Sequence, residues 1–188
     1  MSFPGPLLWL PNLITLARLL AVPVGVYLIL VDKYTSAFWL FLVAGLSDAA
    51  DGFIAKRFGA DSVIGAYLDP LADKALLVSV YLTLGHMGHV PVWLVILIVF
   101  RDLLIIGGAI LFHTLGYPIR IKPLLVSKVN TAAQIVLAAM VLAELGLGAP
   151  LRSLSVPVFY IVAATTLVSG AAYIVTLGWN ALRIEGEP

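Results

Sequence analysis

Six long apolar stretches follow one another along the chain, and short segments with polar residues, glycine or proline separate them. The stretches cover residues 12–31, 35–58, 64–85, 92–115, 123–147 and 155–182. A helix needs roughly 20 apolar residues to cross the hydrocarbon core of a bilayer, and each stretch reaches about that length. Runs this continuous are typical of helices, since a membrane β-barrel has shorter strands of alternating polarity. The pattern therefore predicts an all-α membrane protein with six transmembrane helices.

The composition leaves little room for a soluble part. Of the 188 residues, 62% are hydrophobic and 11% are charged, and the mean hydropathy is +1.08. A soluble domain is about a quarter charged, so lipid is the expected solvent. Residues 1–188 are therefore expected to form a single integral membrane domain. The net charge of +1 argues against a nucleic-acid partner, and the absence of cysteine excludes thiolate metal sites.

Lysine and arginine residues near the ends of the stretches predict the orientation in the membrane. One side carries Lys56, Arg57, Arg120, Lys122 and Arg183, and the other side carries Lys33 and Arg152. Because cytoplasmic loops are enriched in positive charge, both termini and the connections after the second and fourth stretches are expected in the cytoplasm. The N-terminal segment has no basic region and no cleavage site, so no signal peptide is expected. Without an arginine-rich presequence, a bacterial inner membrane is the expected location.

Acidic residues gather where the second and third stretches meet. Asp48 and Asp51 are three residues apart, and Asp69 and Asp73 are four apart, so each pair shares one helix face. A short connection makes these helices antiparallel neighbours, and the four carboxylates are expected to meet at their cytoplasmic end. A carboxylate inside a membrane helix costs roughly 3 kcal/mol, so such residues usually have a function. A structural salt-bridge network is the alternative.

Four carboxylates at close range need compensating positive charge. Oxygen ligands without histidine or cysteine suit Mg²⁺ or Mn²⁺, and this set can hold two ions, an arrangement that assists phosphoryl transfer. Arg18 in the first stretch needs an anionic partner, which the same cluster can supply. Gly52, Ala55 and Gly65 can leave a hollow for a flat group beside the aspartates, although close helix packing also uses small residues.

An ion or proton transporter is the alternative class of protein, because it also places carboxylates inside a membrane. Transporters often have inverted repeats and binding sites near the bilayer midplane. This sequence has no internal repeat, and its aspartates lie near one end of their helices. The pattern therefore favours an enzyme.

The acidic residues belong to a longer pattern. It reads Asp48-x2-Asp51-Gly52-x2-Ala55-Lys56-x8-Gly65-x3-Asp69-x3-Asp73. The pattern resembles the motif of the CDP-alcohol phosphatidyltransferases, except that Lys56 stands where the family usually has arginine, and Arg57 follows it. The resemblance implies a six-helix bundle, a homodimer, and two divalent cations held by the four aspartates, with Asp73 also the general base. It further implies that the CDP-lipid is bound by Gly52, Ala55, Lys56, Arg57 and Gly65.

Polar residues on the later stretches are candidates for the acceptor site. Ser127, Asn130, Thr131 and Gln134 form a polar stripe on the fifth stretch. The candidates for binding an anionic acceptor are Arg101, Arg120, Lys122, Lys128 and Asn130. Two of these cations, Arg120 and Lys122, can instead be positive-inside anchors, and Arg101 can instead form a buried pair with Asp102.

The same region of the sequence resembles one particular group of enzymes within this family. Arg101-Asp102 and the segment Lys122-Pro123-x3-Ser127-Lys128-Val129-Asn130-Thr131-x2-Gln134 are similar to the CDP-diacylglycerol-dependent cardiolipin synthases of mitochondrial type. This resemblance implies that phosphatidylglycerol and CDP-diacylglycerol react to give cardiolipin and CMP. Phosphatidylglycerophosphate synthases, which use glycerol 3-phosphate as the acceptor, are close relatives and the alternative.

Overall fold

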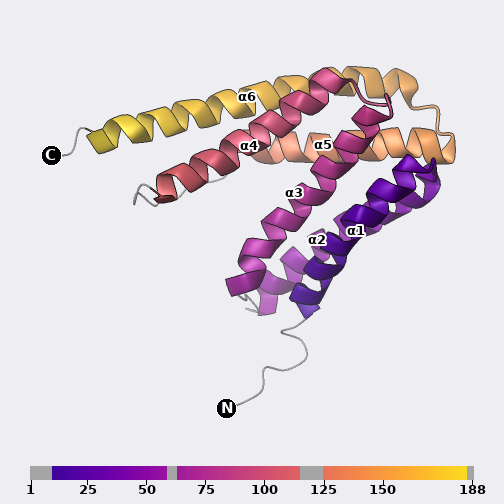
Figure 1. The fold of residues 1–188 in the computed structure, drawn as a ribbon, viewed down its shortest axis with the longest axis horizontal. Helices are drawn as coiled ribbons and strands as arrows, with labels where there is room; N and C mark the ends of the chain where they lie inside the picture. Colours follow the sequence, from indigo (N-terminus) through magenta and orange to yellow (C-terminus); the bar gives the residue numbers. More distant parts are fainter. Residues whose placement is uncertain (1–9, 59–62, 115–124, 186–188) are drawn as a thin grey trace, which may run out of the picture. The chain divides into compact units, whose positions relative to one another are not determined.

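The computed structural model describes residues 10–58, 63–114 and 125–185, and it describes side chains for residues 15–47, for 74–114 except 109 and 113, and for 125–179. The helices are α1 (Leu10–Leu30), α2 (Tyr34–Phe58), α3 (Val63–His86), α4 (Val92–Thr114), α5 (Leu125–Leu147) and α6 (Arg152–Glu185) (Figure 1). Each matches one predicted apolar stretch, and the largest shift is three residues, at both ends of α6. The all-α class is therefore confirmed.

The helix ends are set by residues that adopt a left-handed backbone. Gly88 has φ +76° after α3, and Gly148 has φ +66° after α5. After α3 the Gly88 N–H donates to the Gly85 carbonyl at 3.1 Å, and the His89 N–H donates to the Leu84 carbonyl at 2.9 Å. This pair of hydrogen bonds is a Schellman motif, which satisfies carbonyls that the helix leaves open. The same motif closes α1, where Asp32 takes the left-handed position with φ 59°.

The chain divides into two compact units. One comprises residues 1–89 and 138–151, and the other comprises residues 90–137 and 152–188. In the first unit α1 packs against both α2 and α3, and in the second unit α4 packs along α6. Helix α5 contributes its first half to the second unit and its last turns to the first. The single domain expected from the sequence stays a prediction.

Helix α4 shows which solvent the fold is built for. Large apolar side chains such as Ile96, Phe100 and Leu103 are each more than 60% exposed along one face. The opposite face buries Arg101 and Asp102, which are 3% and 4% exposed. Water-soluble proteins show the reverse arrangement, with charged groups outside. A face of bulky apolar side chains outside and charged groups inside is the arrangement of a helix in lipid.

Among the residues whose side chains are described, three helical segments are long and apolar enough to cross a membrane. They are Val92–Phe112 in α4, Leu125–Leu147 in α5 and Arg152–Trp179 in α6. Two shorter apolar helices, Thr15–Leu30 and Tyr34–Ser47, lie in the first unit. The chain is thus an integral membrane protein, and crossing by all six helices stays a prediction.

Polar contacts tie together one end of the first unit. The Tyr34 hydroxyl donates to Asp32 Oδ1 at 2.6 Å and lies 2.9 Å from His89 Nε2. Since that hydroxyl has a single proton, His89 Nε2–H is the donor of the second bond. Nearby, Thr35 Oγ1 donates to the Gly146 carbonyl at 2.5 Å, and a Cβ at Gly146 would lie 2.6 Å from the backbone of the α2 start. These contacts fix the start of α2, at the end remote from its aspartates.

Candidate active site

The aspartates of the motif lie on two continuous helices. Asp48 and Asp51 lie on α2, and Asp69 and Asp73 lie on α3. The backbone is helical through both segments, so the members of each pair are one turn apart on the same face, as predicted. Their side chains lie outside the described residues, as do those of Ala55, Lys56 and Arg57, and only the helical backbone is described at Gly52 and Gly65. The convergence of the four carboxylates therefore stays a prediction.

The donor chemistry of these residues fits divalent cations. Each aspartate pair offers hard oxygen ligands from one helix face, and Mg²⁺ and Mn²⁺ prefer such ligands. Among the side chains that the structure describes, no group of three or more histidine or acidic residues lies close enough to hold a metal ion.

A buried cation lies on the helix that packs against both aspartate-bearing helices. On α1, Arg18 is 4% exposed, and Thr15, one turn earlier, is also 4% exposed. A guanidinium taken out of water needs negative charge or hydrogen bonds to compensate the lost hydration. Because α1 contacts α2 and α3, the burial of Arg18 fits the expectation that the acidic cluster balances its charge.

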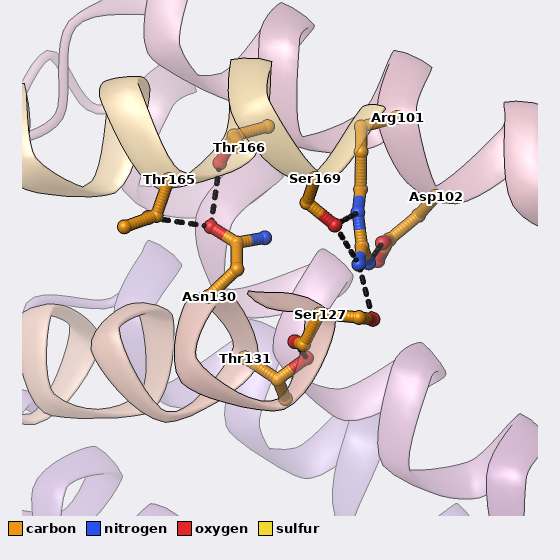
Figure 2. Close-up of polar contacts among 8 residues, drawn as sticks. All are labelled: Arg101, Asp102, Ser127, Asn130, Thr131, Thr165, Thr166 and Ser169. Carbon is orange, nitrogen blue, oxygen red and sulfur yellow. Dashed lines mark hydrogen bonds and ion pairs between the residues drawn. The ribbon is translucent and has the colours of Figure 1, made fainter. Parts of the chain in front are cut away.

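A second polar cluster lies in the other unit, centred on Arg101 of α4 (Figure 2). Its Nη1 donates to Asp102 Oδ1 at 2.7 Å, which is also an ion pair. Its Nε and Nη2 both donate to Ser169 Oγ on α6, at 3.1 and 2.6 Å, and Nη2 also donates to Ser127 Oγ on α5. The guanidinium carbon lies 5.8 Å from the centre of the Tyr173 ring. Arg101 thus joins all three helices of this unit.

These contacts use all but one of the N–H donors of Arg101. A phosphate or carboxylate is bound most strongly through two parallel N–H groups of an arginine. In the arrangement seen, Ser169 occupies the edge formed by Nε and Nη2, while Asp102 and Ser127 occupy the edge formed by the two terminal nitrogens. The buried pair of Arg101 and Asp102 considered from the sequence is therefore present. Acceptor binding by Arg101 stays a prediction, and it would require these contacts to change.

Asn130 on α5 anchors a third set of contacts. It is fully buried, and its Oδ1 accepts hydrogen bonds from the hydroxyls of Thr165 at 2.8 Å and Thr166 at 2.9 Å (Figure 2). Gln134, one turn further along α5, is also fully buried. The predicted polar stripe therefore does face the protein interior at these two positions. Amides placed inside a membrane protein commonly bind across helices in this way.

The remaining acceptor candidates lie partly within and partly outside the described residues. Lys128 lies on α5 with an exposed side chain. Arg120 and Lys122 lie outside the described residues. Sequence reasoning missed the α6 partners of the cluster. Thr166, Ser169 and Tyr173 recur at intervals of three and four residues, which is the spacing of a single helix face and was the available signal.

Helices with lipid-facing apolar side chains and the aspartate motif on α2 and α3 are the features that the family resemblance implies. The chain belongs to the CDP-alcohol phosphatidyltransferase family, whose model matches residues 8–177. This match confirms the resemblance seen in the motif, and it leaves the transporter alternative without support.

Relatives of the chain include cardiolipin synthases and a glycerol-3-phosphate 3-phosphatidyltransferase. The "Cardiolipin synthase (CMP-forming) / mitochondrial hydrolase fusion protein" of Schizosaccharomyces pombe is 35% identical, covering 89% of this chain and 31% of that protein. The "Cardiolipin synthase (CMP-forming)" of Rattus norvegicus is 38% identical, covering 76% of this chain and 52% of that protein. The chloroplastic "CDP-diacylglycerol--glycerol-3-phosphate 3-phosphatidyltransferase 1" of Oryza sativa subsp. japonica is 36% identical, covering 87% of this chain and 55% of that protein. The chain thus spans between about a third and about half of the length of these relatives.

Proposed function

We propose that this protein transfers the phosphatidyl group of CDP-diacylglycerol to a hydroxyl of phosphatidylglycerol, giving cardiolipin and CMP. The observation that carries this proposal is the similarity to the cardiolipin synthases of fission yeast and rat, which extends over most of the chain. The segment that includes Arg101-Asp102 and the α5 polar stripe supports the same acceptor. Both substrates are then two-chain lipids, which is consistent with a chain that has little mass outside its apolar helices.

Two divalent cations, Mg²⁺ or Mn²⁺, are assigned to Asp48, Asp51, Asp69 and Asp73. When bound, they would supply positive charge to the diphosphate of the CDP-lipid and to the leaving phosphate of CMP. The carboxylate oxygens of both helices would hold these cations beside the diphosphate. The donor set fits this role because it contains only hard oxygen atoms from two helix faces.

Asp73 is proposed to remove the proton of the acceptor hydroxyl. A hydroxyl is a poor nucleophile, and a carboxylate within hydrogen-bond reach makes it a better one. The acceptor oxygen then forms a bond to the β-phosphorus, on the lipid side of the diphosphate. The bond from that phosphorus to the bridging oxygen breaks, and CMP leaves with the electron pair. The proton remains on Asp73 until water takes it up.

The CDP-lipid is proposed to lie against the small residues of the motif. Gly52, Ala55 and Gly65 have little or no side chain, so a flat cytosine ring can approach the helix backbone there. The cations Lys56 and Arg57 follow at the end of α2, where they can neutralise phosphate charge. Lys56 acts as a point charge and lacks the paired donors that arginine would offer.

The acceptor is proposed to be attracted by the cations near the start of α5. Arg120 and Lys122 precede this helix in the sequence, and the exposed Lys128 lies within its first turns. Their charge suits an acceptor that carries a phosphate. Asn130 is proposed to contribute a neutral contact to the same acceptor.

The active site is proposed to face the cytoplasm. Its motif lies at the end of α2 and the start of α3, beside the cationic connection of Lys56 and Arg57. We also propose a six-helix transmembrane bundle, a homodimer and a bacterial inner membrane as the setting.

A phosphatidylglycerophosphate synthase is the second candidate. Similarity to the rice enzyme, whose printed name specifies glycerol 3-phosphate, favours it. Glycerol 3-phosphate also carries a phosphate and a glycerol, so the same cations suit it. The chemistry at the diphosphate is unchanged, and only the acceptor differs.

The test of the proposed function is CMP release by the purified protein in lipid–detergent micelles that contain CDP-diacylglycerol. We expect turnover with phosphatidylglycerol and cardiolipin as the product in mass spectrometry. Turnover with glycerol 3-phosphate alone would assign the second candidate and reject the first. If neither acceptor supports CMP release, both candidate functions are rejected.

Removal of divalent cations is expected to stop the reaction. With EDTA in excess, CMP release should fall to background, because repulsion between the four aspartates and the diphosphate is then uncompensated. Added Mg²⁺ or Mn²⁺ should restore it, whereas Ca²⁺ should restore less because its larger coordination shell suits the site less well. Activity that EDTA leaves unchanged would remove the metals from the proposal.

A further inference from the structure

A pair of aromatic side chains lies on the outer surface of α4 and α6. The rings of Trp93 on α4 and Tyr160 on α6 have their centres 6.2 Å apart, a separation at which aromatic rings attract each other. Both side chains are nevertheless largely exposed, at 48% and 65%. Within the described part of the chain, neither the indole N–H of Trp93 nor the Tyr160 hydroxyl has a hydrogen-bond partner. Each ring therefore presents an unused polar group at the surface of a membrane protein.

The surface around the pair is apolar. Val92 and Ile96 on α4 are exposed beside Trp93, and Ile161 on α6 is exposed beside Tyr160. A continuous apolar surface of this kind suits contact with lipid acyl chains. In hydrocarbon, however, an N–H or O–H group without a partner is costly. A position at the edge of the hydrocarbon removes the conflict, because the ring then stays among acyl chains while its polar group reaches the headgroups.

The start of α4 gives an independent reason to place Trp93 at that edge. Trp93 is the second residue of α4, and residues 87–91 before this helix are not helical and include the exposed Gly88. Exposed backbone outside a helix cannot lie in the hydrocarbon, since its N–H and C=O groups would lack partners there. The hydrocarbon must therefore begin near the first turn of α4, which is the turn that carries Trp93.

A third aromatic residue marks the distance to the opposite edge. Trp179 on α6 is also exposed, and it lies 19 residues after Tyr160. At 1.5 Å per residue this separation is about 28 Å along the helix, close to the roughly 30 Å thickness of the hydrocarbon core. No charged residue occurs between these two positions, and Arg152 precedes Tyr160 by about two turns. Both ends of this apolar segment thus carry an aromatic side chain, as membrane-spanning helices commonly do.

We propose that Trp93 and Tyr160 form an anchor that binds phospholipid headgroups at the edge of the bilayer where α4 and α6 begin, with Trp179 at the opposite edge. The indole N–H and the phenol O–H donate to carbonyl or phosphate oxygens of the surrounding phospholipids, which supply the acceptors that acyl chains lack. Because α4 and α6 pack along each other and run in the same direction (Figure 1), the pair holds both helices at one depth. The anchor does not depend on which acceptor the enzyme uses.

The test measures the depth of single tryptophans in phosphatidylcholine vesicles. In the triple variant Trp9→Phe, Trp39→Phe and Trp179→Phe, only Trp93 remains as a tryptophan. One set of vesicles contains phosphatidylcholine with a nitroxide on its headgroup, and the other contains phosphatidylcholine with a nitroxide near the end of an acyl chain. We expect the headgroup label to quench the Trp93 fluorescence at least about twofold more strongly than the acyl-chain label.

Phe100→Trp is the matched control, made in the chain whose four native tryptophans are all replaced by phenylalanine. Phe100 is exposed on the same face of α4 as Trp93, and it lies seven residues further along, or about 10 Å deeper. Its fluorescence should be quenched more strongly by the acyl-chain label. Tyr160→Trp in the same tryptophan-free chain should be quenched like Trp93, as should the variant that keeps only Trp179.

Two outcomes would overturn the inference. One is a ratio of headgroup to acyl-chain quenching for Trp93 that does not exceed the ratio for Phe100→Trp, because the ring then lies within the hydrocarbon. The other is weak quenching of Trp93 by both labels while Phe100→Trp is quenched normally, because a second copy of the chain then covers the pair. If the triple variant does not fold, the difference between the unmodified protein and Trp93→Phe gives the same ratio.

Failure of the proposed function gives a different result. The quenching measurement needs no turnover, so it reports the position of the pair even in a chain that releases no CMP with either acceptor. Conversely, normal cardiolipin synthesis with Trp93 deep in the hydrocarbon would support the proposed function and reject the anchor.

Discussion

Replacement of Asp73 by asparagine is expected to abolish CMP release, with a loss of at least about a thousandfold in kcat. Asparagine cannot take the proton of the acceptor hydroxyl, and it also removes one negative charge from the proposed cation ligands. The side chain keeps nearly the same size, and position 73 lies inside α3, so the helix should persist. The measurement is CMP release at saturating CDP-diacylglycerol and phosphatidylglycerol, together with the elution profile and thermal midpoint of the purified variant.

Asp32→Asn is the matched control for this variant. Asp32 lies in the turn between α1 and α2 with φ 59°, a conformation that asparagine tolerates well. Its Oδ1 accepts a hydrogen bond from Tyr34, and an asparagine oxygen can accept the same bond. The control should therefore keep the original rate. Full activity of Asp73→Asn would remove the general-base assignment, and an equal loss in both variants would point to damage to the protein.

The helices could be predicted because lipid makes the sequence pattern simple. A crossing segment must satisfy every backbone group internally and remain apolar over its length, so its extent can be recognised directly. The ends of α3 and α5 could be predicted for a local reason as well. Gly88 and Gly148 take left-handed conformations there, which glycine adopts without a steric penalty.

Contacts between helices could not be predicted in the same way. Periodicity shows which residues of one helix share a face, and it says nothing about the partner on another helix. The threonines of α6 illustrate this limit, because Thr165 can also bond to the Ile161 carbonyl of its own helix at 3.0 Å. Only the packing of α5 near α6 shows that Thr165 and Thr166 meet Asn130. The contact between Tyr34 and His89 joins residues that lie even further apart in the sequence.

In the candidate site, too, features within a helix could be predicted and contacts between helices could not. The motif could be recognised because its residues lie within two helices that follow each other in the chain. Their spacing can therefore be read directly from the sequence. The helical backbone agrees with that spacing, and the meeting of the carboxylates stays a prediction. The acceptor side depends on three helices, so the sequence left Arg101 with two possible roles. Its contacts with Asp102, Ser127 and Ser169 favour a structural role for this residue.

Replacement of Arg101 by methionine therefore tests the structural role of this residue directly. We expect a large loss of stability. Asp102 is 4% exposed and forms an ion pair with Arg101 at 2.7 Å, and removing one partner of a buried pair typically costs about 3–5 kcal/mol. The double variant Arg101→Met and Asp102→Leu removes both charges and should recover most of the loss. Lys33→Met, at an exposed position, should change the stability by less than about 0.5 kcal/mol. The measurement is the free energy of unfolding in mixed micelles under an SDS titration. A single variant that is as stable as the original, with only a raised KM for the acceptor, would instead make Arg101 an acceptor ligand.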